Sequence, residues 1–369
     1  MDDNSFTFTA IQGTQAGAAY YVIMVPLKVV PRLFKFDDES MPTELRAQRV
    51  LNKARVPTIA AYIANNAEEY ILSSLCASID GGMEFEPVAS TGPLRKVGQL
   101  KVDMGAVILI NDGQHRRAAI EEAVRDRPSL GDETLSVVVF PDKGLARSQQ
   151  MFADLNIHAV RPTRSIKLLY DHRDDAAALS RKVVDAVPLF REFTCFDTAS
   201  LSNRSIKLVT FSSVHQATAE LIAGAVPAMK SPEEALDRAA RFWSAVIAQM
   251  PDWQRVQTRE VASGELRKNY VHAHGVALQA IARAGVQLIA THPDDWEARL
   301  GGLRRIDWSR SNKAVWDNRA LVGGKVNRAT NNVTLVANII VQALDLPLSP
   351  DAARVEAMVA PIPVRAEAV

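Results

Sequence analysis

The sequence predicts an α+β protein in which a mixed α/β domain comes first and an all-α domain follows. Up to about residue 140, β-branched apolar runs alternate with segments of helical periodicity, as in TLSVVVF at residues 134–140. From about residue 162 onward nearly every periodic segment has helical spacing, and all five tryptophans lie in that later part. We therefore expect two domains, residues 1–160 and residues 161–369.

Apolar periodicity and turn residues place the elements within each domain. The first domain is expected to contain strands at residues 6–11, 18–25, 70–79, 100–103, 106–110 and 134–140, with a hairpin turn at 12–17 and helices at 42–54, 57–65 and 145–156. The second is expected to contain helices at residues 163–170, 175–187, 210–223, 232–250, 264–284 and 332–344, with a loose tail from residue 360.

Composition is ordinary for a globular protein, with 47% hydrophobic and 23% charged residues among 369. The net charge of +1 provides no global attraction to nucleic acid, so any DNA contact must come from a local basic patch. Cys76 and Cys195 lie far apart and have no neighbours at metal-ligand spacing, which favours a reduced, cytoplasmic setting. The acidic N-terminus lacks a signal-peptide pattern, and no apolar run approaches the roughly 18 residues of a membrane span.

The most informative stretch is AVILINDGQHRRAA at residues 106–119, which reads as strand, tight turn and helix. Asp112 is the expected N-cap, and Gly113 permits close backbone approach. Unpaired N–H groups at a helix start attract anions, and His115, Arg116 and Arg117 add donors suited to phosphate oxygens. The sequence predicts a phosphate cradle here. The alternative is a strand-to-helix turn with solvated arginines.

Residues Asp112 to Arg116, including Gln114, spell DGQHR and resemble the signature of the DGQHR-domain proteins, whose best-known members are the DndB proteins of bacterial DNA phosphorothioation systems. Further similar segments follow in matching order at residues 152–156 (FADLN), 161–163 (RPT), 168–172 (LLYDH), 201–205 (LSNRS) and 270–275 (YVHAHG). The resemblance covers about residues 5 to 345. It implies a protein that binds promoter DNA and represses the modification genes.

The turn also has a more distant likeness to ParB proteins and sulfiredoxins, which hold nucleotide phosphates there. Gly113, His115 and Arg116 match the sulfiredoxin pattern, but Gln114 replaces the reactive cysteine, which excludes sulfinic-acid repair. The acidic residue of ParB is missing, which weakens the case for metal-assisted nucleotide hydrolysis.

The same likeness implies a nucleotide, ATP or CTP with Mg²⁺, as cofactor and a second wall for its pocket. Asp154 and Asn156 match the positions of an acid and an amide that face the nucleotide in ParB proteins. The alternative is that Asp154 is a solvated helix residue and Asn156 a C-cap.

Basic clusters in the second half could follow a DNA backbone, fixing position more than sequence. The candidate DNA-binding residues are Arg161, Arg164, Lys167, Arg204, Lys207, Arg267, Lys268, Arg304, Arg305 and Arg310. Lys313 extends the last set, which is interleaved with Tyr270 and Trp308. The alternative is a solvated basic face.

Other site chemistry is not indicated. His272 and His274 are two residues apart and belong to no metal-binding pattern, so no metal is expected. There is no nucleophile elbow, Walker loop or Cys-x-x-Cys pair, and no helix-turn-helix signature.

The sequence supports three hypotheses about function. The leading one is a DNA-binding regulator of a phosphorothioation system, and the alternative is a nucleotide-dependent switch or NTPase built on the motif turn. A third is an assembly partner whose motif is structural. The candidate partners are double-stranded DNA, other phosphorothioation proteins and a second copy of the chain, with no membrane.

Overall fold

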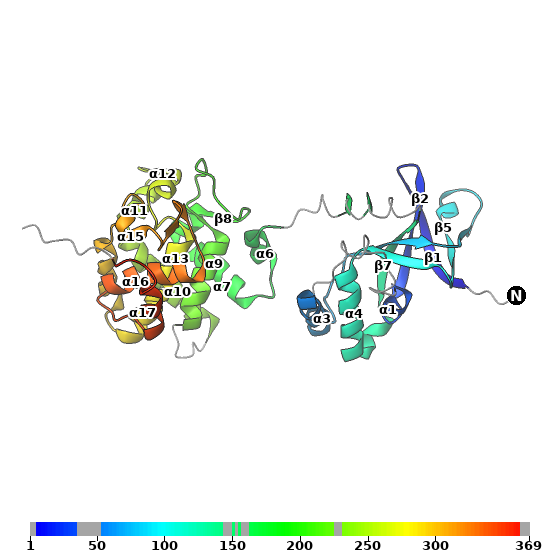
Figure 1. The fold of residues 1–369 in the computed structure, drawn as a ribbon, viewed down its shortest axis with the longest axis horizontal. Helices are drawn as coiled ribbons and strands as arrows, with labels where there is room; N and C mark the ends of the chain where they lie inside the picture. The colour runs from blue at the N-terminus through cyan, green and yellow to red at the C-terminus, as the bar shows by residue number, and fades with distance from the viewer. Residues whose placement is uncertain are drawn as a thin grey trace, which may run out of the picture. The chain divides into compact units, whose positions relative to one another are not determined.

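The structure, a computed structural model, divides the chain into two compact units, Met1–Val160 and Arg161–Val369 (Figure 1). It describes residues 5–34, 53–142, 150–151, 154–155, 162–224 and 231–361. Most of the predicted helix at 42–54, most of that at 145–156, and the tail beyond residue 361 lie outside the described residues. So do Asn156 and Arg161.

The first unit is built on a seven-stranded sheet with the strand order β4-β5-β1-β2-β7-β3-β6. Its strands are β1 (Ser5–Gln15), β2 (Ala18–Pro26), β3 (Leu75–Asp80), β4 (Met83–Pro87), β5 (Val97–Asp103), β6 (Val107–Asp112) and β7 (Thr134–Pro141). Its helices are α1 (Val30–Leu33), α3 (Val56–Asn65) and α4 (Gln114–Asp126), with 3₁₀ turns η1 (Lys53–Arg55), η2 (Pro93–Lys96) and η3 (Pro128–Asp132). Only β3 and β7 pair in parallel among these strands.

One face of this sheet carries the apolar core. Successive side chains of a strand point to opposite faces, and the aligned residues Ile23, Val137 and Leu75 are all buried. α4 packs against both α3 and α1, and its Ala119 and Ile120 are fully buried in the same core (Figure 1). The three helices thus cover the face on which these residues lie.

The β1–β2 hairpin is tighter than expected. Only Ala16 and Gly17 form the turn, both with positive φ (50° and 74°), which matches the twist of a two-residue hairpin. Gly13 continues the strand opposite Tyr20. The expected turn at 12–17 was therefore too long.

The second unit is mostly helical. Its helices are α6 (Arg164–Tyr170), α7 (Asp175–Ala186), α8 (Pro188–Phe193), α9 (Phe211–Gly224), α10 (Pro232–Ala248), α11 (Pro251–Gln257), α12 (Ser263–Asn269), α13 (Gly275–Thr291), α14 (Trp296–Arg299), α15 (Lys313–Trp316), α16 (Thr330–Ala343) and α17 (Pro350–Glu356), with the 3₁₀ turn η4 (Leu300–Arg305). Two short ladders pair β8 (Thr194–Cys195) with β9 (Val209–Thr210) and β10 (Leu321–Val322) with β11 (Lys325–Val326).

α13 is the central helix of this unit. It packs against both α9 and α16, and its residues from Val276 to Leu288 are largely buried. The helix that the sequence predicts over residues 264–284 is wrong in one respect, because the backbone leaves the helix between Asn269 and Gly275. Tyr270 pairs with Ser309 across a β-bridge, and the Val271 N–H donates to Trp308 O (2.9 Å). These strand-like contacts replace intrahelical bonds.

The α+β prediction is confirmed: the sheet comes first and the mostly helical part follows. Within the part of the chain that the structure describes, no helix has the length and apolarity needed to cross a bilayer.

Candidate functional site

The DGQHR residues form the expected connection between β6 and α4. Gly113 has φ 106°, and a Cβ there would come within 2.3 Å of Leu75 Cδ2 and 2.9 Å of Arg116 Nη2. Only glycine fits this conformation and this space. The predicted N-cap is wrong: Asp112 is the last residue of β6, Gly113 is the N-cap, and no side chain caps α4.

The two arginines of the motif have internal partners. Arg116 Nη2 donates to Asp112 Oδ2 (2.7 Å) and Ser74 O (3.1 Å), and its Nη1 donates to Ser73 Oγ (2.6 Å). Arg117 donates to two carbonyl groups of α1 and its C-cap, at Pro31 (3.0 Å) and Phe34 (2.9 Å), and pairs with Glu121 (3.0 Å). Both guanidinium groups therefore join α4 to neighbouring segments.

The groups at this turn that could still bind an anion are the uncapped start of α4 and the residues around it. Burial lowers the pKa of His115, and Arg55 and Arg116 lower it further, so its ring is neutral at pH 7. Gln114 is partly buried at the first helical position. Burial, with the Asp112 carboxylate nearby, raises the pKa of Cys76 to about 12, which makes that thiol a poor nucleophile. Asp154 is exposed and accepts a hydrogen bond from Gln150 (2.6 Å).

In the second unit, Arg267 joins segments that are far apart in the sequence. Its side chain is buried at 5% exposure and donates to the carbonyl groups of Ser202 (2.6 Å), Ser205 (3.0 Å) and Lys207. Its own carbonyl accepts from His274 Nε2 (2.8 Å). The structure thus brings the LSNRS and YVHAHG segments together around one buried guanidinium. The Arg267 guanidinium is therefore not accessible to DNA, and the prediction that it contacts the DNA backbone is wrong.

A polar hollow of about 670 Å³ opens next to Arg267, and we call it the basic hollow. It is lined by Lys268, Asn269, Tyr270, Ser309, Arg310, Ser311, Lys313, Asp317, Leu321 and Gly324. Three cations and one carboxylate give this lining a net charge of +2. Lys268 and Lys313 are exposed, and neither ammonium group has a hydrogen-bond or ion-pair partner among the described residues.

Arg310 and Tyr270 shape this hollow. Arg310 Nη1 donates to Arg267 O and Lys268 O (both 3.3 Å), and its Nη2 donates to Gly324 O (3.0 Å). One guanidinium therefore links the end of α12 to the β10–β11 turn. Tyr270 stacks on His272 with ring centroids 5.1 Å apart.

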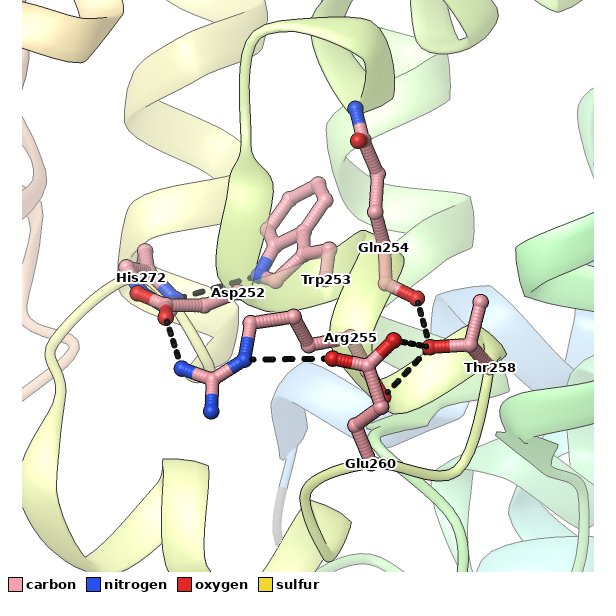
Figure 2. Close-up of polar contacts among 7 residues, drawn as sticks. All are labelled: Asp252, Trp253, Gln254, Arg255, Thr258, Glu260 and His272. Atoms are coloured by element: carbon pink, nitrogen blue, oxygen red, sulfur yellow. Dashed lines mark hydrogen bonds and ion pairs between the residues drawn. The ribbon is translucent and has the colours of Figure 1, made fainter.

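His272 is itself locked in place (Figure 2). Its Nδ1 accepts from Trp253 Nε1 (3.0 Å), and its Nε2–H donates to Asp252 Oδ2 (3.2 Å). This pattern requires the neutral ring, and burial lowers the pKa of His272 accordingly. The Asp252 carboxylate contacts Arg255, which also pairs with Glu260. The histidine that the sequence left unassigned supports the wall of the hollow.

The other predicted DNA contacts divide into paired and unpaired groups. Arg304 donates to Gln249 Oε1 and Ala248 O, and Arg305 pairs with Asp345 (2.7 Å). Lys207 Nζ donates to Glu192 O (2.6 Å). By contrast, Arg164, Lys167 and Arg204 are exposed, and their side chains have no such partner within the described ranges.

Sequence reasoning missed several residues of the basic hollow. Ser309, Ser311 and Asn269 were not singled out, because single hydroxyl and amide side chains give no pattern before the fold is known. The one usable signal was the likeness of residues 270–275 to a family segment.

Comparison with protein families gives one match over most of the chain. The model of the DndB family, described as DNA-sulfur modification-associated, matches residues 8–347. The searches found no match among curated proteins or solved structures, so the ParB and sulfiredoxin likeness stays a prediction. The matched residues include the DGQHR turn, Arg267 with its carbonyl partners, and the basic hollow. The chain belongs to the DndB family, which is associated with DNA sulfur modification.

Proposed function

We propose that this protein is a DNA-binding repressor of a DNA phosphorothioate modification system and that the basic hollow contacts the sugar–phosphate backbone. The observation that carries the proposal is the pair Lys268 and Lys313, which line the hollow and whose ammonium groups have no partner among the residues that the structure describes. Family membership supplies the link to DNA sulfur modification.

The lining of the hollow suits a phosphodiester. Backbone contacts in protein–DNA complexes come from cations together with hydroxyl and amide groups, and Ser309, Ser311 and Asn269 supply the latter. Unpaired lysines release condensed counterions when they contact phosphates, whereas a lysine already paired to a carboxylate contributes less. With a net charge of only +1 on the whole chain, such a local patch is required for DNA binding.

Replacing Lys268 or Lys313 by alanine is expected to weaken duplex binding roughly tenfold near 0.1 M salt and to reduce the slope of log K against log[salt] by about 0.9 for each lysine. The measurement is fluorescence anisotropy of a labelled promoter duplex at several salt concentrations. A reporter driven by the same promoter should be derepressed by the double variant K268A/K313A.

Arg305→Ala is the matched control, because Arg305 is exposed like the lysines but already pairs with Asp345. Its affinity and salt slope should stay close to those of the wild type. Unchanged duplex affinity in the double lysine variant would refute the hollow as the DNA contact, and duplex binding that is absent in the wild type would refute DNA binding itself.

A second candidate is a nucleotide-dependent switch or NTPase at the DGQHR turn, favoured by the uncapped start of the 13-residue helix α4 directly after Gly113. Arg116 and Arg117 have internal partners, so this candidate depends on backbone N–H groups and on His115.

The test of this candidate is a thermal shift with ATP, CTP and GTP in the presence of Mg²⁺. A nucleotide at 100 times its Kd should raise stability by about 2.7 kcal/mol, and His115→Ala should reduce the shift, whereas the exposed His172→Ala should not. If no nucleotide changes the melting temperature, the turn is a structural motif.

A further inference from the structure

We propose that the second unit holds a phosphate-binding site between Arg164 and Arg328, separate from the basic hollow. Three segments meet there: the start of α6 at Arg164, the start of α9 at Ser212 and Ser213, and Arg328 ahead of α16. The ligand is a phosphate group, carried by a DNA backbone or by a small phosphorylated molecule.

Hydrogen bonds connect these segments step by step. The Ser212 N–H donates to Ser165 Oγ (3.3 Å), which places Arg164 next to the start of α9. Arg328 Nη1 donates to Ser213 Oγ (3.0 Å), and the Ser213 and Thr210 hydroxyl groups lie 2.9 Å apart. Arg164 and Arg328 thus both adjoin the short polar segment at the start of α9.

Neither guanidinium group has a carboxylate as an ion-pair or hydrogen-bond partner in the described part of the chain. Loss of hydration lowers the pKa of Arg328, and repulsion by Arg164 lowers it further. Two arginines that adjoin the same polar segment and have no carboxylate partner among the described residues form a suitable receptor for an oxyanion, since guanidinium groups bind phosphate oxygens in pairs.

Backbone around Arg328 adds to the positive potential. α13 begins at Gly275 and α16 at Thr330, both without a side-chain cap, so first-turn N–H groups lack intrahelical acceptors. A Cβ at Gly275 would come within 2.5 Å of Ser213 Oγ and 2.8 Å of Arg328 Nη1. Glycine keeps the start of α13 close to the arginine. These helix starts support the site, and the two side chains define it.

The experiment is calorimetric titration of the full chain with sodium orthophosphate at constant ionic strength, with sodium chloride as the reference. We expect saturable binding by the wild type. The affinity for orthophosphate should fall roughly tenfold or more in Arg328→Gln and in Arg164→Gln, because each variant loses a charged donor. Arg304→Gln is the matched control, since its guanidinium already donates to Gln249 and Ala248. Arg164 and Arg328 are both exposed, but Arg328 also donates to Ser213, so the R164Q variant decides the question if R328Q does not fold.

Competition separates the two sources of the phosphate. If orthophosphate displaces a labelled duplex from the wild type and from K268A/K313A, the site holds a DNA phosphate. If orthophosphate binds but displaces no duplex, the site serves a small phosphorylated ligand, and ATP is the next titrant. Absence of orthophosphate binding by the wild type, or equal affinity in R328Q, R164Q and R304Q, overturns the proposal without bearing on the lysines of the basic hollow.

Discussion

Replacing Glu356 by alanine is expected to lower the free energy of unfolding by about 3–5 kcal/mol, because it leaves a buried charge without its partner. Arg319 is only 2% exposed, and its Nη2 pairs with Glu356 Oε1 at 2.6 Å. The other oxygen of that carboxylate accepts from Asn338 Nδ2 (2.9 Å), so α16 and α17 depend on the same acid. Urea denaturation followed by tryptophan fluorescence measures the effect, since every tryptophan lies in this unit.

Two further variants test the physical reason. Arg354→Ala removes a surface partner of Asp351 and should change stability by less than about 1 kcal/mol. The double variant R319M/E356L, which replaces the buried pair by apolar groups of similar size, should be more stable than E356A alone. If E356A and R354A have the same small effect, the Arg319–Glu356 pair does not contribute as argued.

Acidification is expected to destabilise the second unit between about pH 6.5 and pH 4. Burial lowers the pKa of His274 from 6.5 to about 4, and Arg310, Arg267 and His272 add to the shift. As pH falls below 6.5, the His274 side chain binds a proton in the unfolded chain but not in the folded state. The contribution of His274 to the free energy of unfolding is therefore fully present above pH 6.5 and is lost as pH falls toward 4. A shift of this size corresponds to about 3 kcal/mol.

The comparison of wild type with His274→Gln isolates this contribution. Glutamine can still donate to Arg267 O, as His274 Nε2 does, but it does not titrate. The difference in unfolding free energy between pH 7 and pH 4 should therefore be smaller in H274Q by about 3 kcal/mol. The exposed His172→Gln should leave that difference unchanged, and an H274Q profile parallel to the wild type would contradict the assignment.

Secondary structure followed from the sequence where local preference and burial agree. The run TLSVVVF became β7, and the predicted helices near 57–65 and 332–344 became α3 and α16. β4 was missed although MEFEP alternates apolar residues with glutamates as a half-buried strand does, because the alternation covers only four residues before Pro87. The break between α12 and α13 was missed because its cause is the pairing of Tyr270 with Ser309, a long-range contact.

The candidate site was predictable only in outline. The DGQHR motif located a strand–turn–helix, but whether Arg116 faces a ligand or Asp112 depends on side-chain geometry. Arg267 and Lys268 are adjacent and chemically similar, yet one is buried beneath three carbonyl groups and the other is exposed. Arg328 was not predicted as a site residue, because its neighbours Ser213 and Gly275 are remote in sequence.

The double attachment of Arg310 has a consequence for ligand affinity and lifetime. A guanidinium that ties the end of α12 to the β10–β11 turn makes the cavity rigid before any ligand arrives, so association forfeits little conformational entropy. Severing one attachment would leave every charge in place and still weaken retention. The affinity of the basic hollow for a ligand thus depends partly on Arg310, although the donors of Arg310 bind carbonyl groups of the protein itself.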